Sequence, residues 1–128
     1  MIVLDTHAWV WWATNSSKLS KRASESISSE QLILVPAISV WEVAMLVSTD
    51  RLGFDRDVSI WVTQALSLSR VQLSPLSPSI AVRSTRLPGE IHLDPADRIV
   101  VATSIEYGAP LVTKDKKLRA YKHIRTIW

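Results

Sequence analysis

The sequence predicts an α/β sandwich built around a mostly parallel β-sheet. Short apolar runs, of the kind found in buried parallel strands, alternate with longer stretches of helical pattern. The chain has 128 residues, which is near the commonest size of one domain. Its composition, with 47% hydrophobic and 21% charged residues, is that of an ordinary globular protein. We therefore expect a single domain over residues 1–128.

Five apolar runs are candidate strands, and six stretches between them are candidate helices. The strands are expected at Ile2–Leu4, Leu32–Val35, Val71–Leu73, Leu111–Thr113 and, closing an edge, Thr126–Trp128. The helices are expected at Thr6–Ala13, Lys18–Ser29, Ala37–Ser48, Arg56–Ser67, Ser79–Arg86 and Asp94–Tyr107. Such alternation of strand and helix is typical of a parallel sheet covered by helices.

Cysteine content and hydropathy restrict the class of protein further. No apolar run reaches the roughly 18 residues that a membrane-spanning helix needs. The first residues carry an acid and lack a basic leader, which is unlike a secretory signal. We therefore expect a cytoplasmic protein. Because the chain has no cysteine, any bound metal must be held by oxygen or imidazole.

Glu42 is the first candidate site residue. It lies in the segment VPAISVWEVAMLV, whose only other polar side chain is Ser39. An unpaired ionised carboxylate is costly to bury, so Glu42 should meet a cation, a metal or a proton. A structural salt bridge is the alternative. Ser39, three residues earlier on the same helical face, either shares a polar pocket with Glu42 or bonds back to a helix carbonyl.

Asp5 and Asp115 each follow an apolar run predicted to be a strand. Ligands of open α/β sheets bind beyond the carboxyl ends of the strands, where such residues lie. The alternative for both is capping of the helix that follows. Thr6 and Thr113 are placed either to hydrogen-bond to the carboxylates or to serve as local turn hydroxyls.

The segment LDPADRIVVATS contains two acids with different expected roles. Asp94 is a good N-cap, followed by a proline at the first helical position. Asp97 shares a helical face with Val100 and Val101, so it should look toward a groove beside the core. We assign Asp97 to the site and Asp94 mainly to capping, with a supporting metal role left open.

Three or four carboxylates with no cysteine and few histidines favour a hard cation such as Mg²⁺ or Mn²⁺. The net charge is +3, with fifteen Lys and Arg against twelve acids. If four acids converge in one site, the rest of the molecule carries fifteen basic groups and eight acids. Such a surface suits a polyanionic partner. A net charge needed only for solubility explains the same numbers. His7 is a candidate for contact with the substrate.

Three segments together resemble the PIN-domain family, in the version found in VapC toxins. They are DTHAWVWW near the start, SVWEVA in the middle and LPGEIHLDPADRIVVATSIEYGAPLVTKD near the end. The resemblance implies a three-layer α/β/α fold and a Mg²⁺ or Mn²⁺ site, with Asp5, Glu42 and Asp97 as its main acids and Asp115 as the fourth. It also implies endonucleolytic RNA cleavage, a homodimer and inhibition by a VapB-like antitoxin. The competing function is a catalytically inactive PIN fold that binds RNA or protein.

Two further features concern partners. A basic region near the end either holds RNA backbone or an acidic antitoxin segment, or is a solvated helix surface; its members are Lys114, Lys116, Lys117, Arg119, Lys122 and Arg125. The chain also has six tryptophans. Trp9 and Trp12 share a helical face while Trp11 lies about 160° from Trp9, so we expect at least one tryptophan to meet a partner.

Overall fold

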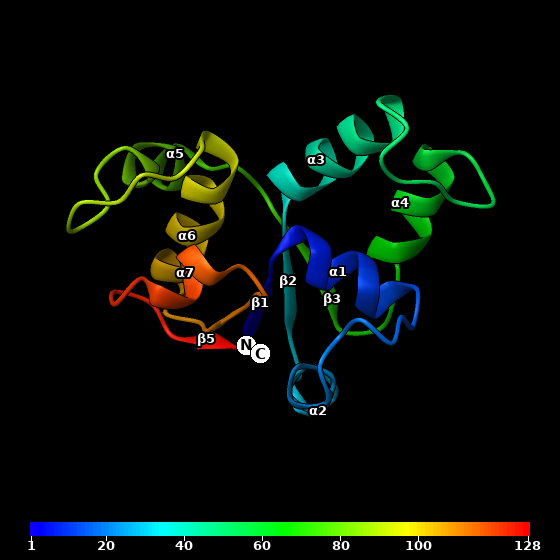
Figure 1. The fold of residues 1–128 in the computed structure, drawn as a ribbon, viewed down its shortest axis with the longest axis horizontal. Helices are drawn as coiled ribbons and strands as arrows, with labels where there is room; N and C mark the ends of the chain where they lie inside the picture. The colour runs from blue at the N-terminus through cyan, green and yellow to red at the C-terminus, as the bar shows by residue number, and fades with distance from the viewer.

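The computed structural model describes all residues from 1 to 128 and shows a five-stranded sheet with helices on both faces (Figure 1). The strands are β1 (Ile2–Leu4), β2 (Ile33–Pro36), β3 (Val71–Ser74), β4 (Leu111–Val112) and β5 (Thr126–Ile127). The helices are α1 (Thr6–Ala13), α2 (Lys21–Ser29), α3 (Ala37–Ser48), α4 (Val58–Leu66), α5 (Pro78–Ser84), α6 (Pro95–Tyr107) and α7 (Lys116–Ala120). No helix has the length and apolar character needed to cross a bilayer.

The sheet has the order β3-β2-β1-β4-β5, and every neighbouring pair is parallel. The predicted α/β class is therefore confirmed, and the sheet is entirely parallel. Parallel strands need long crossover connections, which the helices between them supply. As a result the carboxyl ends of the strands all lie at one edge of the sheet.

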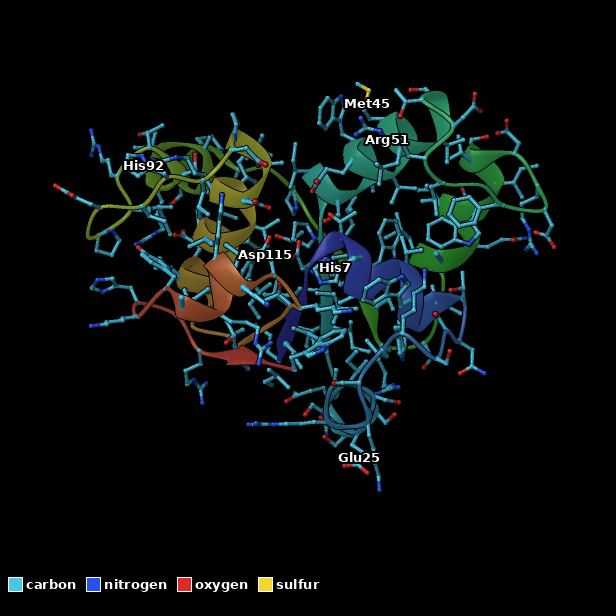
Figure 2. All side chains as sticks on the ribbon, in the orientation of Figure 1. His7, Glu25, Met45, Arg51, His92 and Asp115 are labelled. Carbon is cyan, nitrogen blue, oxygen red and sulfur yellow. The ribbon has the colours of Figure 1, made fainter.

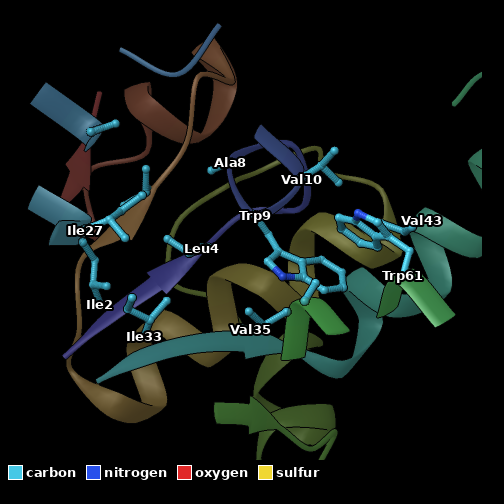
Figure 3. Close-up of a cluster of buried hydrophobic side chains, with 13 residues drawn as sticks. Ile2, Leu4, Ala8, Trp9, Val10, Ile27, Ile33, Val35, Val43 and Trp61 are labelled. Carbon is cyan, nitrogen blue, oxygen red and sulfur yellow. The ribbon is translucent and has the colours of Figure 1, made fainter. Parts of the chain in front are cut away.

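Successive side chains of a strand point to opposite faces of the sheet, and helices cover both faces, so each central strand is buried on both sides. Ile2 and Leu4 join the hydrophobic cluster formed with α1, α2, α3 and α4, which contains the buried pair Trp9 and Trp61 (Figure 3). Val3, from the same strand, joins the second cluster, formed with α6 and α7. This two-sided burial explains why the strands appear in the sequence as continuous apolar runs.

Several predicted helix starts were too early, and in each case a capping residue explains the difference. The helix expected from Lys18 begins at Lys21, because the Ser20 hydroxyl accepts the Ala23 backbone N–H at 3.1 Å. The helix expected from Arg56 begins at Val58, after the Asp57 cap. The helix expected at Asp94 begins one residue later, since Asp94 is its cap.

The remaining differences are small. The helix expected at Ser79–Arg86 is Pro78–Ser84, with its proline in the first turn after the Ser77 cap. The strand expected at Leu32–Val35 is Ile33–Pro36, and Val71–Leu73 extends to Ser74. The last two strands end one residue before the predicted Thr113 and Trp128. The short helix α7 was foreseen only as the alternative role of Asp115.

Candidate active site

The site lies where the order of the strands reverses. β1 has β2 on one side and β4 on the other. The strands β2 and β3 therefore extend the sheet in one direction from β1, and β4 and β5 extend it in the other. Open α/β sheets bind ligands at such a switch point. Asp5 follows β1 and is only 4% exposed, and its Oδ2 accepts a hydrogen bond from the hydroxyl of Thr113, which follows β4, at 2.8 Å. The other carboxylate oxygen accepts the Thr6 backbone N–H at 2.8 Å, so Asp5 also caps α1.

A pocket of about 310 Å³ opens at this point. It gathers Asp5, Glu42, Asp97 and Asp115, while Asp94 is not among the lining residues. The walls come from α1, α3, α6 and the start of α7, and Figure 2 labels His7 on α1 and Asp115 close to one another. The complete lining is Asp5, Thr6, His7, Val10, Trp11, Glu42, Leu46, Arg51, Leu52, Asp97 and Asp115.

Glu42 is held by a hydroxyl and meets no basic side chain. Thr6 Oγ1 lies 2.7 Å from Glu42 Oε1 and 2.9 Å from Ser39 Oγ. A hydroxyl has one proton, so Thr6 donates to the carboxylate and accepts from Ser39. Ser39 is completely buried, and its hydroxyl bonds to Thr6 beside Glu42 and not to a helix carbonyl. Burial raises the pKa of Glu42, and the charges of Asp5 and Asp94 raise it further against the opposing Thr6 hydrogen bond.

Asp97 differs from the other acids because no protein group donates a hydrogen bond to its carboxylate. Burial raises its pKa to about 7, together with the negative charges of Asp94, Asp5, Asp115 and Glu42. Asp94 serves as the cap of α6, since its Oδ1 accepts the Asp97 backbone N–H at 3.0 Å. Asp94 is thus the cap expected from the sequence, whereas the metal-binding role of Asp97, which lines the pocket, stays a prediction.

Asp115 caps α7 and lines the pocket at the same time. Its Oδ1 accepts the backbone N–H groups of Lys117 at 2.8 Å and Leu118 at 3.3 Å. Its own N–H donates to Thr113 Oγ1 at 3.1 Å. The Thr113 hydroxyl thus connects Asp5 and Asp115. Asp115 therefore both caps α7 and lines the pocket.

His7 closes one side of the pocket as a neutral imidazole. Burial lowers its pKa, outweighing the opposite effects of Asp5 and Asp115. Its Nε2 accepts the Lys114 backbone N–H at 2.8 Å, so the ring proton is on Nδ1, which lies 3.6 Å from Asp5 Oδ2. The ring also packs against Trp11, with the two centroids 5.1 Å apart.

Arg51 also lines the pocket, and the sequence did not predict it there. It is the one lysine or arginine that lines the pocket, and it makes no ion pair. Asp50 has a left-handed backbone with φ of 58°, and the Arg51 N–H then bonds to the Leu46 carbonyl at 2.9 Å. This turn carries Arg51 back over the end of α3. The only local signal was an Asp shortly before a Gly after the helix, which indicates a turn but not its direction.

The side chains that line the acidic pocket suit a divalent cation by their chemistry. Four carboxylates without sulfur ligands match the preference of Mg²⁺ and Mn²⁺ for oxygen. Burial, and after it the charges of the neighbouring carboxylates, raises the pKa of Asp97, so a cation beside this group would favour its ionised form. No three carboxylate or imidazole groups lie close enough in this structure to form a complete metal site. A bound ion would have to draw the acids closer together.

Comparisons with known proteins identify the family. The family model for the PIN domain matches residues 2–124, so the chain belongs to the PIN-domain family. Ribonuclease VapC22 of Mycobacterium tuberculosis is 37% identical over 129 aligned positions, which cover 99% of this chain and 98% of that protein. Within the family, the chain therefore falls among the VapC ribonucleases. PIN ribonucleases are in general metal-dependent.

Solved structures show the same fold at low sequence identity. VapBC2 from Rickettsia felis, bound to a DNA fragment from its promoter, matches with a TM-score of 0.71 at 16% identity, covering 98% of this chain and 97% of that one. VapC20 of Mycobacterium tuberculosis, a sarcin–ricin-loop-cleaving toxin, matches with a TM-score of 0.67 at 15% identity, covering 98% and 99%. These likenesses confirm the PIN-like architecture.

Proposed function

We propose that this chain is a VapC-type toxin that cleaves RNA internally, with Asp5, Glu42, Asp97 and Asp115 holding Mg²⁺ or Mn²⁺. The observation that carries the proposal is the convergence of these four carboxylates in one pocket of a VapC-family chain. A cation held there would lower the pKa of a water molecule and neutralise charge that develops on the phosphodiester.

The chain's own residues prepare the pocket for this chemistry. Thr6 and Thr113 orient Glu42 and Asp5 through hydrogen bonds of 2.7 and 2.8 Å, the kind of support that keeps ligand carboxylates in place. Asp97 has no such partner and a pKa near neutrality, so a nearby positive charge shifts it to the carboxylate form. Arg51 is placed to bind a phosphate oxygen of the substrate, which offsets the repulsion between the acids and RNA.

The proposed partners follow from the family. Two solved structures with the same fold are VapBC2 of Rickettsia felis and a toxin–antitoxin complex of Klebsiella pneumoniae, and the second matches with a TM-score of 0.68. We propose that a VapB-like antitoxin inhibits this chain, that the chain forms a homodimer, and that it acts on RNA in the cytoplasm.

The deciding experiment is an RNA-cleavage assay with protein purified free of antitoxin. Total RNA is incubated with Mg²⁺, with Mn²⁺ or with EDTA, and Asp97→Asn protein prepared identically reports contaminating nucleases. We expect cleavage by the wild type with either ion and none in EDTA or with the variant. Cleavage that persists in EDTA would refute metal dependence. RNA binding without cleavage in every buffer would favour the inactive PIN-fold module.

A further inference from the structure

A second pocket, outside the acidic one, is lined by basic side chains. It measures about 390 Å³ and lies between α2, α7 and the end of β5. Arg22, Lys116 and Arg119 line it, together with Ala120, Thr126 and Trp128. None of the three basic side chains makes an ion pair or a hydrogen bond with another protein group. Three unpaired cations around one hollow create a positive potential that attracts anionic groups.

An aromatic cluster connects this basic pocket to the acidic one. Trp128 lines the basic pocket, while His7 and Trp11 line the acidic pocket. The ring centroid of Trp128 lies 6.0 Å from that of His7 and 5.9 Å from that of Trp11. The two pockets therefore share one continuous wall of partly buried aromatic rings.

Two further cations lie over this aromatic wall. The Lys114 Nζ is 5.7 Å and the Lys18 Nζ is 6.0 Å from the ring centroid of Trp11. Aromatic rings flanked by cations along a groove are the arrangement that binds single-stranded nucleic acid, because bases stack on the rings while phosphates meet the cations. An acidic peptide would satisfy the cations and leave the rings without a partner.

We propose that the basic pocket is a second RNA subsite, which holds the backbone of single-stranded RNA one or more nucleotides away from the bond in the acidic pocket. The inference rests on the proposed function, since the same RNA strand occupies both pockets. Four carboxylates around the reacting phosphodiester repel a polyanion and Arg51 is the one lysine or arginine in that pocket, so further affinity must come from cations beside it. Arg22, Lys116 and Arg119 bind phosphates, and Trp128 stacks on a base between the pockets.

The test measures binding separately from cleavage. All variants carry Asp97→Asn and are titrated in EDTA with a fluorescently labelled oligouridylate at several salt concentrations. The Arg22→Gln/Arg119→Gln protein is compared with Arg56→Gln/Arg86→Gln, which removes the same charge from arginines that line neither pocket and lie outside the basic region near the end of the chain. We expect weaker binding only in the first protein, and a slope of log Kd against log salt smaller by about 1.4, at about 0.7 per phosphate contact.

Trp128 provides a second, independent arm. Trp128→Ala should weaken oligouridylate binding about 5- to 150-fold, and Trp128→Phe should restore most of the affinity because it keeps a stacking ring. The ring also packs against the core, so thermal melting must show that both variants are folded. Annealing the RNA to its complement should reduce the affinity of the unmodified pocket, since paired bases cannot stack on the protein.

Two results would overturn the subsite. One is equal affinity and equal salt slope in the two double-arginine variants. The other is unchanged RNA binding in the Arg22→Gln/Arg119→Gln protein that loses affinity for an oligoglutamate peptide, which would assign the pocket to an acidic protein segment. Failure of the proposed function would be seen in the cleavage assay, where the wild-type chain would show no metal-dependent cleavage.

Discussion

Asp94 and Asp97 lie three residues apart at the start of α6, and the structure separates their roles. Asp94 accepts a backbone N–H, whereas the Asp97 carboxylate faces the acidic pocket without a donor. We expect Asp97→Asn to abolish RNA cleavage and Asp94→Asn to retain more of it, because Asn is an adequate N-cap. Initial cleavage rates of the two purified variants give the ranking, and the reverse order would mean that the metal-binding role belongs to Asp94.

Thr113 supports the acidic pocket through hydrogen bonds that its neighbours in the sequence do not reveal. It is completely buried, and its hydroxyl bridges the Asp5 carboxylate and the Asp115 backbone N–H. Thr113→Val keeps the shape of the side chain and removes these bonds, so we expect cleavage to fall about 10- to 100-fold. Thr103→Val is the matched control, since the equally buried Thr103 hydroxyl bonds only to the Ile99 carbonyl of its own helix. Similar losses in both variants would point to a general packing defect.

At the scale of elements, α7 depends on the residue that also lines the pocket. Asp115 accepts two backbone N–H groups at the start of this five-residue helix. Asp115→Asn keeps a capping side chain but loses the charge, while Asp115→Ala loses both. We expect both variants to cleave RNA poorly and only the alanine variant to lose about 1 kcal/mol of unfolding free energy. Urea unfolding measures the second quantity, and full activity in Asp115→Asn would reduce Asp115 to a capping residue.

At the scale of the whole molecule, the acidic pocket makes stability depend on pH and metal. The folded-state pKa of Asp97 is about 7, above the ordinary value of about 3.9 for an unfolded aspartate. Folding therefore favours the protonated form. The contribution to stability is fully present below about pH 4 and is lost as the pH rises through about 7. We expect the metal-free protein to melt at a lower temperature at pH 8 than at pH 5.

Added cation should reverse this loss. Mg²⁺ at about 100 times its dissociation constant would add about 2.7 kcal/mol of stability. Asp97→Asn removes one repelling charge, so its metal-free form should melt no lower than the wild type, and Mg²⁺ should raise its melting temperature much less. Melting curves in EDTA and in Mg²⁺ test both statements. A strongly destabilised metal-free variant would show that Asp97 has a structural role.

The distribution of tryptophans bears on the oligomeric state. Trp9 and Trp61 are buried in the core, whereas Trp41 on α3 is 55% exposed and has the exposed Met45 one turn away. An exposed tryptophan beside another large apolar side chain is typical of an interface. We expect sedimentation at tens of micromolar to give a dimer of the 14.3 kDa chain. A monomer at that concentration would contradict the prediction.

The order and type of the main elements, and the acids worth testing, could be predicted from local sequence patterns. Buried parallel strands must be apolar on both faces, so runs such as Ile2–Leu4 were visible without tertiary information. The helices Thr6–Ala13 and Ala37–Ser48 were also predictable, because each begins directly after a strand, the first with Asp5 as its cap. Glu42 stood out because a carboxylate is costly inside an apolar segment.

How these residues come together depends on the packing of the folded chain. The hydrogen bond between Asp5 and Thr113 joins positions 108 residues apart, and it exists because β1 pairs with β4. The direction of the turn that returns Arg51 to the pocket depends on packing, as does the meeting of Arg22 with α7 around the basic pocket. The hydrophobic pattern of a segment indicates which of its own faces is buried. Convergence of polar side chains from different segments follows from the register of the sheet and the packing of the helices upon it.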